Sequence, residues 1–178
     1  EIFQTGNILN ANAQISGGGE KSTYSSSFGY HDREGMLLNT GYKRFAYRLK
    51  SEFQLHDRVT VGQNFYVNQT TTRGTNTTSS YSGAIINAIY MNPAAPVYDE
   101  AGNFHGTVPS DLSGFSSIYG DTYNPVALLL RPTVNNPTLN LNGNAFAKVD
   151  ILDGLTFKSN FGLNMRRYSL KRFDPKIP

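Results

Sequence analysis

The sequence predicts an all-β fold and, within that class, part of an antiparallel β-barrel that crosses a membrane. Two observations support this prediction. Apolar and polar residues alternate over six segments, and a period of two is typical of strands with two different faces. Short and long connections also alternate between these segments. Membrane barrels show this arrangement, with tight turns at one end and long loops at the other.

The first two expected strands cover residues 8–16 and 22–31. In the first, Leu9 and Ile15 share a face with two alanines, whereas asparagine, glutamine and serine share the other face. Three glycines follow and predict a turn, because glycine adopts turn conformations without steric cost. In the second strand, phenylalanine and tyrosine alternate with serine and threonine.

The third and fourth expected strands cover residues 43–55 and 59–69, and they show the clearest alternation. Apolar side chains from Phe45 to Leu55 fall on one face, and mostly charged side chains fall on the other. A short turn at residues 56–58 separates the two strands. Because one face is apolar and the other is mostly charged, we predict that the two faces of this sheet lie in different environments.

The fifth and sixth expected strands cover residues 138–151 and 155–168, with a turn at Asp153 and Gly154. Leucine, alanine, valine, phenylalanine and methionine lie on one face of this pair, and asparagine, lysine and arginine lie on the other. Each of the six segments is close to the roughly 9–11 residues that a tilted strand needs to cross a bilayer.

The long connection at residues 70–138 is expected to have structure of its own, since loops beyond about 15 residues usually carry function or local structure. Residues 82–91 predict a short helix, and residues 124–129 predict another short helical or packed stretch. Residues 97–104 predict a small hairpin, with Gly102 supplying the positive φ of its turn. The alternation of connections places this segment on the outer side of the membrane.

Composition narrows the function classes. The chain has 178 residues, of which 16% are charged and 12% aromatic, and it has no cysteine. Globular proteins carry about 25% charged residues, so this chain is poor in charge, and asparagine, serine, threonine and glycine take the place of the charged residues. Cysteine nucleophiles and thiolate metal sites are excluded. No run of about 18 apolar residues is present, so strands are the remaining route across a bilayer.

The sequence also lacks the common catalytic and nucleotide-binding motifs. The sequence has no dense cluster of lysine and arginine, so we predict no nucleic-acid partner. The three histidines lie far apart in the sequence and near expected turns or loops. We therefore predict a protein that is not an enzyme, with no catalytic residues, no metal site and no cofactor.

Candidate binding residues are the aromatic and amide side chains of the long connection and the cations of the polar strand faces. Aromatic rings and amides bind polar uncharged ligands without burying an unpaired charge. Packing within the loop, or anchoring at the membrane interface, is the alternative role for each. The predicted substrate-binding residues are Tyr81, Tyr90, Tyr98, Asn103, Tyr119, Tyr123, Arg48, Lys50 and Lys158.

Six segments of the chain carry a resemblance to a known family. They are EIFQTG at residues 1–6, SGGGEKSTY at 16–24, GYHDREGMLLNTGYKR at 29–44, GAIINA at 83–88, PVYDEAGNF at 96–104 and NPVA at 124–127. Together they resemble the SusC/RagA family of TonB-dependent transporters, and the resemblance covers nearly the whole chain in the family's order.

The resemblance implies a 22-stranded barrel with a plug domain in the outer membrane of Bacteroidetes. It also implies active import of a large nutrient, a glycan or a peptide, energised by TonB, with a SusD-like surface lipoprotein as a lid. Residues 1–178 would then form one barrel segment in contact with outer-membrane lipid. The plug and the part that meets TonB would belong to a longer parent protein.

A second hypothesis comes from a different class of protein. A soluble β-sandwich, acting as a carbohydrate-binding or adhesin module, also alternates apolar and polar residues. It would bury Phe45, Leu49 and Phe53 in a dry core between two sheets. Whether this segment is soluble and unfolds in a two-state manner without detergent separates the two hypotheses.

Overall fold

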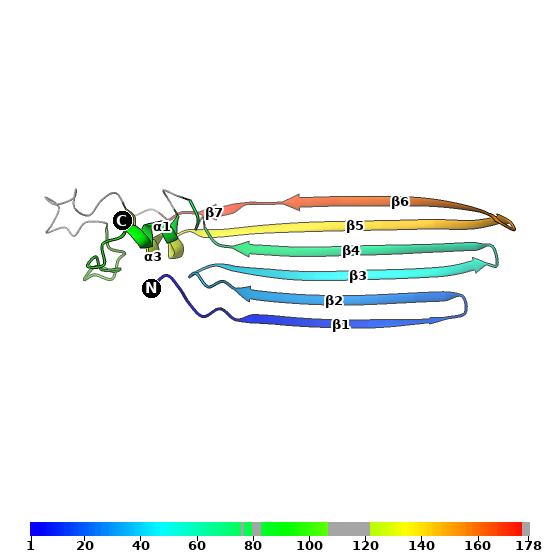
Figure 1. Ribbon diagram of the computed structural model, residues 1–178, viewed down its shortest axis with the longest axis horizontal. Helices are drawn as coiled ribbons and strands as arrows, with labels where there is room; N and C mark the ends of the chain where they lie inside the picture. Colours follow the sequence, from blue (N-terminus) through cyan, green and yellow to red (C-terminus); the bar gives the residue numbers. More distant parts are fainter. Residues whose placement is uncertain (76, 80–82, 107–121, 176–178) are drawn as a thin grey trace.

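The computed structural model describes residues 1–75, 77–79, 83–106 and 122–175 and shows one long sheet with a smaller loop region at one end (Figure 1). Six antiparallel strands are neighbours in chain order. They are β1 (Ile8–Gly19), β2 (Ser22–Glu34), β3 (Gly41–His56), β4 (Val59–Arg73), β5 (Thr133–Leu152) and β6 (Leu155–Tyr168). The predicted all-β class is confirmed.

Three smaller elements complete the described chain. Helices α1 (Ala84–Tyr90) and α3 (Pro125–Leu130) lie within the long connection, and the short strand β7 (Lys171–Phe173) pairs with β5. No helix in the described residues is long and apolar enough to cross a membrane. The short helix predicted within residues 82–91 is present as α1, and the short helical or packed stretch predicted at residues 124–129 is helix α3.

Tight turns lie at the end of the sheet opposite the helices (Figure 1). Strands β1 and β2, β3 and β4, and β5 and β6 are each joined by two residues. The prediction that Gly17 begins the first turn is wrong, because Gly17 still pairs with Tyr24 inside the sheet. A Cβ added to Gly17 would lie 2.6 Å from the Tyr24 hydroxyl. This glycine therefore admits a close aromatic neighbour rather than a turn.

The strands extend further toward the loops than the alternation indicated. Strand β4 continues through Arg73, and β5 begins at Thr133, so the long connection covers residues 74–132 rather than 70–138. Likewise, residues 35–40 join β2 to β3. The asparagines and Pro137 at the start of β5 suggested a loop, but residues 136–138 pair with threonines of β4. Threonine is β-branched and fits a strand well.

Pairing register assigns each strand residue to one of two faces. In β3, Phe45, Tyr47 and Leu49 share a face with Phe65 of β4, and we call it the apolar face. Arg48, Lys50 and Glu52 lie on the opposite, polar face, as the alternation predicts. Extended through the register of β5 and β6, the apolar face holds Phe157, Phe161 and Leu163, and the polar face holds Lys158 and Asn160.

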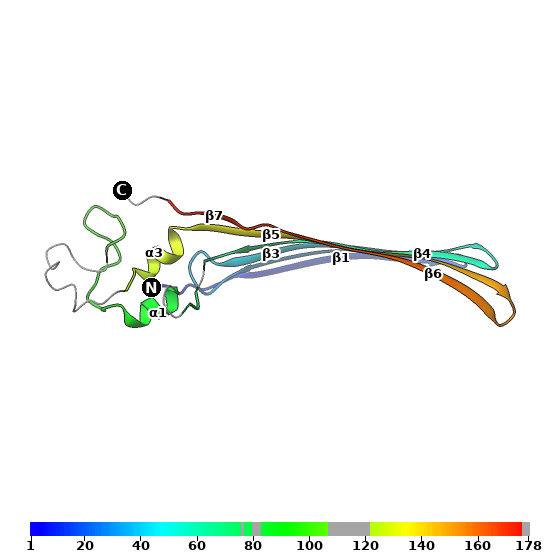
Figure 2. The ribbon, with the colours of Figure 1, turned by 90° about the horizontal axis from the view of Figure 1, so that it is seen from above.

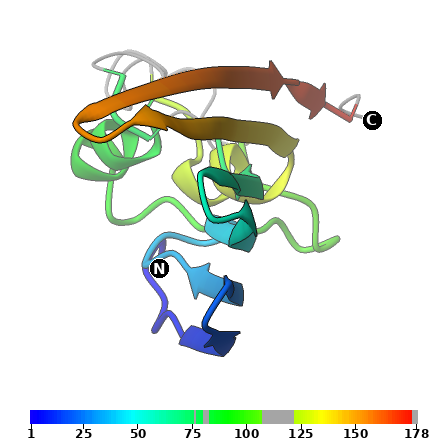
Figure 3. The same ribbon diagram turned by 90° about the vertical axis from the view of Figure 1, so that its right-hand side faces the viewer.

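Neither face is covered by a second layer of described protein. On the apolar face, Phe45 is 48% exposed and Phe161 is 73% exposed. Seen edge-on, the sheet is a single long layer (Figure 2). Seen along the strands, it forms an open arc rather than a closed barrel (Figure 3).

The apolar face carries an uncharged band of defined height. Its charged residues all lie in the three rows nearest the loops, and they are Asp32, Glu34, Lys43, Arg73 and Arg167. Along β6 the band runs from Leu155 to Met165, which is about 33 Å at roughly 3.3 Å per residue. A strand tilt of about 40° reduces this to about 25 Å, the height of the apolar band in membrane barrels.

A small hydrophobic core lies at the loop end and not under the sheet. Its buried members are Ile2, Ala84, Val126 and Leu129. Partly buried side chains surround them, namely Leu37, Leu38, Ala88, Val97, Phe104 and Leu128. This core joins the N-terminal segment 1–7, the connection 35–40 and the described residues of 74–132. We call this assembly the loop platform.

Candidate functional site

The predicted binding residues separate into two groups at two places. Tyr90, Tyr98, Asn103 and Tyr123 lie in the loop platform, whereas Arg48, Lys50 and Lys158 lie on the polar face of the sheet. Tyr81 and Tyr119 lie outside the described residues. The structure therefore offers two candidate surfaces, one at the loop end and one along the strands.

The predicted hairpin at residues 97–104 is present in the loop platform. Tyr98 pairs with Phe104 in an isolated antiparallel bridge, and their rings stack with centroids 5.2 Å apart. Gly102 has a φ of +82° and supplies the turn as predicted. The Asn103 backbone N–H donates to Asp99 Oδ1 at 2.8 Å, so Asn103 closes the turn, and Tyr98 remains half exposed.

Amide side chains connect the parts of the platform. Asn124 caps α3, because its Oδ1 accepts hydrogen bonds from the backbone N–H groups of Val126 and Ala127, each at 3.1 Å. Its Nδ2 donates to the Val97 carbonyl at 2.8 Å, which ties the helix to the hairpin. Asn39 donates to the Leu129 carbonyl at 2.9 Å across 90 positions of sequence. Each such bond contributes about 1 kcal/mol.

A hollow of about 570 Å³ opens beside α3 in the platform. Its lining includes Phe104, His105, Tyr123, Leu128, Arg131 and Arg172. Cavities of roughly 300–1,000 Å³ accommodate small ligands. Tyr123 is the predicted residue that reaches this hollow. Tyr90 ends α1 with 68% of its surface exposed and is not part of the lining.

The charged groups around this hollow differ in their partners. Arg172 donates to both carboxylate oxygens of Asp174, at 2.6 and 3.0 Å, and these hydrogen bonds lower the pKa of Asp174. Arg131 has no ion-pair partner among the described residues. Sequence reasoning missed Arg131 and Arg172 as candidate binding residues, because no local pattern indicates that both line one hollow.

On the polar face, Arg48 lies over the ring of Tyr66, with its Cζ 5.0 Å from the ring centroid. The two residues are direct partners across β3 and β4. Together with Arg44, Asn12, Gln14 and Ser27, they line a shallow hollow of about 310 Å³. A cation over an aromatic face is attracted electrostatically, so Tyr66 holds the guanidinium of Arg48 in place.

Asparagine dominates the neighbouring part of the polar face. Asn64, Asn142, Asn144 and Asn164 line a second hollow of about 300 Å³. Asn140 donates to Asn68 Oδ1 at 3.0 Å across β4 and β5. Each amide offers two donors and an acceptor. The sequence contained the signal for this surface, since asparagine occupies every second position from residue 140 to residue 144.

Lys50 and Lys158 lie in different parts of the same face. Lys50 pairs with Asn64 in the register, one row from Arg48. Lys158 lies near the tight turns, opposite Lys148, and its Nζ is 4.5 Å from the centroid of the Phe146 ring. The three predicted cations therefore do not form one cluster.

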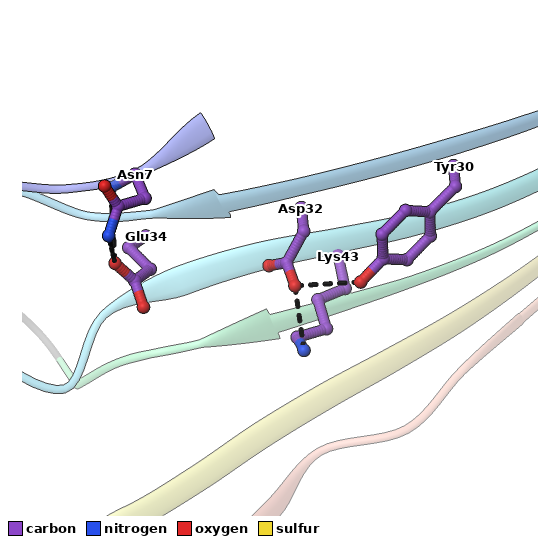
Figure 4. Close-up of polar contacts among 5 residues, drawn as sticks. All are labelled: Asn7, Tyr30, Asp32, Glu34 and Lys43. Atoms are coloured by element: carbon purple, nitrogen blue, oxygen red, sulfur yellow. Dashed lines mark hydrogen bonds and ion pairs between the residues drawn. The ribbon is translucent and has the colours of Figure 1, made fainter. Parts of the chain in front are cut away.

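A paired polar group marks the loop end of the apolar face (Figure 4). Lys43 Nζ lies 2.9 Å from Asp32 Oδ2, and the Tyr30 hydroxyl donates to the same oxygen at 2.9 Å. Nearby, the side chain of Asn7 donates to Glu34 at 2.9 Å. The Lys43–Asp32 pair neutralises charge where the apolar band ends, and Asn7 satisfies the Glu34 carboxylate by hydrogen bonding.

The described residues contain no group of three or more histidine, cysteine, aspartate or glutamate side chains that could hold a metal ion. The two surfaces instead present aromatic rings, amides and guanidinium groups. Such side chains bind a ligand through stacking, hydrogen bonds and charge. The two surfaces are therefore suited to binding a ligand.

Comparison with known proteins identifies relatives over nearly the full chain. No family model matches the sequence. Two relatives from Formosa agariphila are TonB-dependent receptor P3, 26% identical over 98% of this chain, and TonB-dependent receptor P39, 28% identical over 98%. A third, TonB-dependent receptor P26, is 25% identical over 93% of the chain. The chain spans only 17%, 15% and 16% of these relatives, respectively.

Solved structures also match this chain, and they do so in fold. The RagAB peptide importer in its closed-closed state matches with a TM-score of 0.70 and 22% identity, over 92% of this chain and 18% of that chain. A structure of the RagAB peptide transporter matches with a TM-score of 0.69 and 22% identity, over 94% and 19% of the two chains. The predicted resemblance is thereby confirmed: this chain is similar over nearly its full length to a segment of TonB-dependent receptors, and its fold matches a segment of the RagAB structures.

Proposed function

We propose that the chain forms part of the wall of an outer-membrane importer that takes up a large nutrient, either a glycan or a peptide. The observation that carries this proposal is the contrast between the two sheet faces. One face has an uncharged band about 25 Å high, and the other carries amides and cations. Lipid would cover the first face, and an aqueous lumen would border the second.

The soluble β-sandwich hypothesis has less support. A sandwich needs a second layer over the apolar face, about 10 Å away. In the described residues the platform core lies beyond the strand ends, and Phe45 and Phe53 remain 48% and 44% exposed. A barrel wall needs no such layer, because lipid takes its place.

The positions of the connections support an orientation for this wall. The tight turns would face the periplasm, and the loop platform would face the outside, as in barrels with short periplasmic turns and long outer loops. A SusD-like lipoprotein would then close over the platform side. TonB would act through parts of the parent protein outside this chain. Both partners rest on the resemblance to RagAB and to the TonB-dependent receptors.

Cargo contacts are proposed on both surfaces. At the platform, Tyr123 and the exposed faces of Tyr90 and Tyr98 would stack on cargo during entry. On the polar face, Arg48 and Lys50 would contact it within the lumen, and Lys158 would lie nearer the periplasmic end. Asn103 would contribute through its amide beside the Asp99 turn. Tyr81 and Tyr119 stay sequence predictions.

The orientation can be tested by cysteine labelling, since this segment has no cysteine of its own. Glu100→Cys in the hairpin and Asp57→Cys in a tight turn would be made in the full-length transporter. A membrane-impermeant maleimide should label Glu100→Cys in intact cells. It should label Asp57→Cys only after the outer membrane is permeabilised. Equal labelling of both positions in intact cells would contradict the proposed wall.

Import itself needs a separate measurement. Cells with and without the parent gene would be given fluorescent oligosaccharide and peptide mixtures, and each strain would also be tested without TonB. Uptake should require both the transporter and TonB. Uptake that is the same in all strains would show that the parent protein does not import these nutrients.

A further inference from the structure

The two faces of the sheet differ in net charge as well as in polarity. In strands β1 to β6, every residue of which is described, the polar face carries Arg33, Arg44, Arg48, Lys50, Lys148, Lys158 and Arg166 against Glu52 and Asp150. Seven positive and two negative charges give a net charge of +5. The apolar face, with three positive and two negative charges, has a net charge of only +1.

Positive charge on the polar face is concentrated toward the loop end. Going from the tight turns to the loops, Asp150, the pair Lys148 and Lys158, and Glu52 come first, and only cations follow beyond Glu52. These cations are Arg33, Arg44, Arg48, Lys50 and Arg166, which we call the cationic strip. All five are exposed, and none has an ion-pair partner among the described residues. Several unpaired cations on one face of a sheet attract anions from solution.

The best-formed part of the strip is the hollow between Arg44 and Arg48. These two residues lie four positions apart on the same face of β3, a spacing of about 13 Å along the strand. Both line the 310 Å³ hollow with Asn12 and Gln14, and Tyr66 supports Arg48. A guanidinium group binds a carboxylate or a sulfate through two parallel hydrogen bonds.

We propose that the cationic strip binds an anionic glycan, with Arg44 and Arg48 holding its carboxylate or sulfate groups. This inference rests on the proposed function and names its class of cargo. A glycan fits better than an acidic peptide, because the strip is surrounded by amides and hydroxyls that match sugar hydroxyl groups. Ala46 is the aliphatic side chain between the two arginines on this face, so apolar peptide side chains would find little to pack against.

The test uses the purified full-length transporter and the double variant Arg44→Gln/Arg48→Gln. Four probes of similar length would be compared by calorimetry: hexagalacturonate, a sulfated carrageenan hexasaccharide, maltohexaose and hexaglutamate. At least one of the two anionic glycans should bind most tightly, and its affinity should fall with added salt. The double variant should lose roughly tenfold to a hundredfold in that affinity.

Lys43→Gln provides the matched control, since it removes a positive charge from the same strand on the opposite face. It should change affinity less than twofold. Tighter binding of hexaglutamate than of both anionic glycans would overturn the cargo class. Equal affinities for the native protein and the double variant would overturn the site. If the double variant destabilises the plug domain and leaves affinity unchanged, the strip contacts the plug and the proposal is wrong.

Failure of this inference can be told apart from failure of the proposed function. TonB-dependent uptake of maltohexaose or hexaglutamate, with no binding of either anionic glycan, would overturn the anionic cargo and leave import standing. Absence of TonB-dependent uptake for every probe and nutrient mixture would overturn the proposed function, and the inference with it.

Discussion

Placing a charge in the middle of the apolar band is the most direct test of the proposed wall. Leu49 lies four residues from Phe45 and six from Leu55, the limits of the apolar stretch on β3. Its cross-strand partners are Ser26 and Phe65, and no charged residue shares this part of the apolar face. Leu49→Arg would therefore set a guanidinium near the centre of the bilayer.

The expected cost follows from the depth of Leu49. Arginine on the lipid face of a barrel costs about 2–4 kcal/mol at the midplane and about 0–1 kcal/mol near the interface. The folding equilibrium of the full-length transporter should thus fall by roughly 30-fold to 700-fold, at about 1.4 kcal/mol for each factor of ten. Equilibrium unfolding in guanidinium chloride, with the protein folded into phospholipid vesicles, measures this change.

Lys50→Ala is the matched control. It changes the next residue of the same strand, but on the polar face, and an exposed substitution there should cost less than about 0.5 kcal/mol. Equal shifts for the two variants would refute the assignment of faces to lipid and water. So would an unchanged stability for Leu49→Arg, because it would mean that water reaches the apolar face.

Three further predictions test the sheet and the platform. Gly62→Ala should lower the free energy of unfolding by about 1–3 kcal/mol, because its Cβ would lie 2.4 Å from the Phe146 ring. Adding Phe146→Leu to this variant should restore part of the thermal stability, because leucine is smaller. Asn124→Ala should remove the N-terminal cap of α3 and lower the stability of the platform by about 1 kcal/mol. Amide hydrogen exchange should become faster in the platform and stay unchanged in the strands. Deleting residues 98–104 should leave assembly in the membrane intact and reduce cargo uptake or co-purification of the lid; normal uptake and normal co-purification would show that the hairpin only packs.

The sheet was the part of the fold that could best be predicted from the sequence. A period of two decides which side chains share a face, and two-residue turns transmit that assignment from one strand to the next. Across the long connection the apolar character of each strand's face replaces the turn, so Phe45 and Phe161 could still be placed on the same, apolar face. Strand ends were harder, because Pro137 and the glycines after Ser16 suggest turns locally, whereas pairing with neighbouring strands extends the sheet through them.

The candidate surfaces were only partly visible in the sequence. Arg48 could be assigned to the polar face, but its contact with Tyr66 depends on the register that the turn at residues 57 and 58 sets. The platform hollow was hidden for a different reason. It brings together residues from the hairpin, from α3 and from the segment after β7, and no periodic pattern links segments so far apart.

The long connection between β4 and β5 has a consequence for the order in which the wall assembles. Every other pair of neighbouring strands from β1 to β6 is joined by two or six residues, but residues 74–132 make up a connection of 59. Closing it costs about 2 kcal/mol more chain entropy than closing a six-residue connection. The platform offsets this cost by holding the two ends close, with the Gly74 N–H donating to the Val134 carbonyl at 3.4 Å. The meander β1–β4 and the hairpin β5–β6 would therefore form first, and formation of the platform would set the rate at which the two halves join.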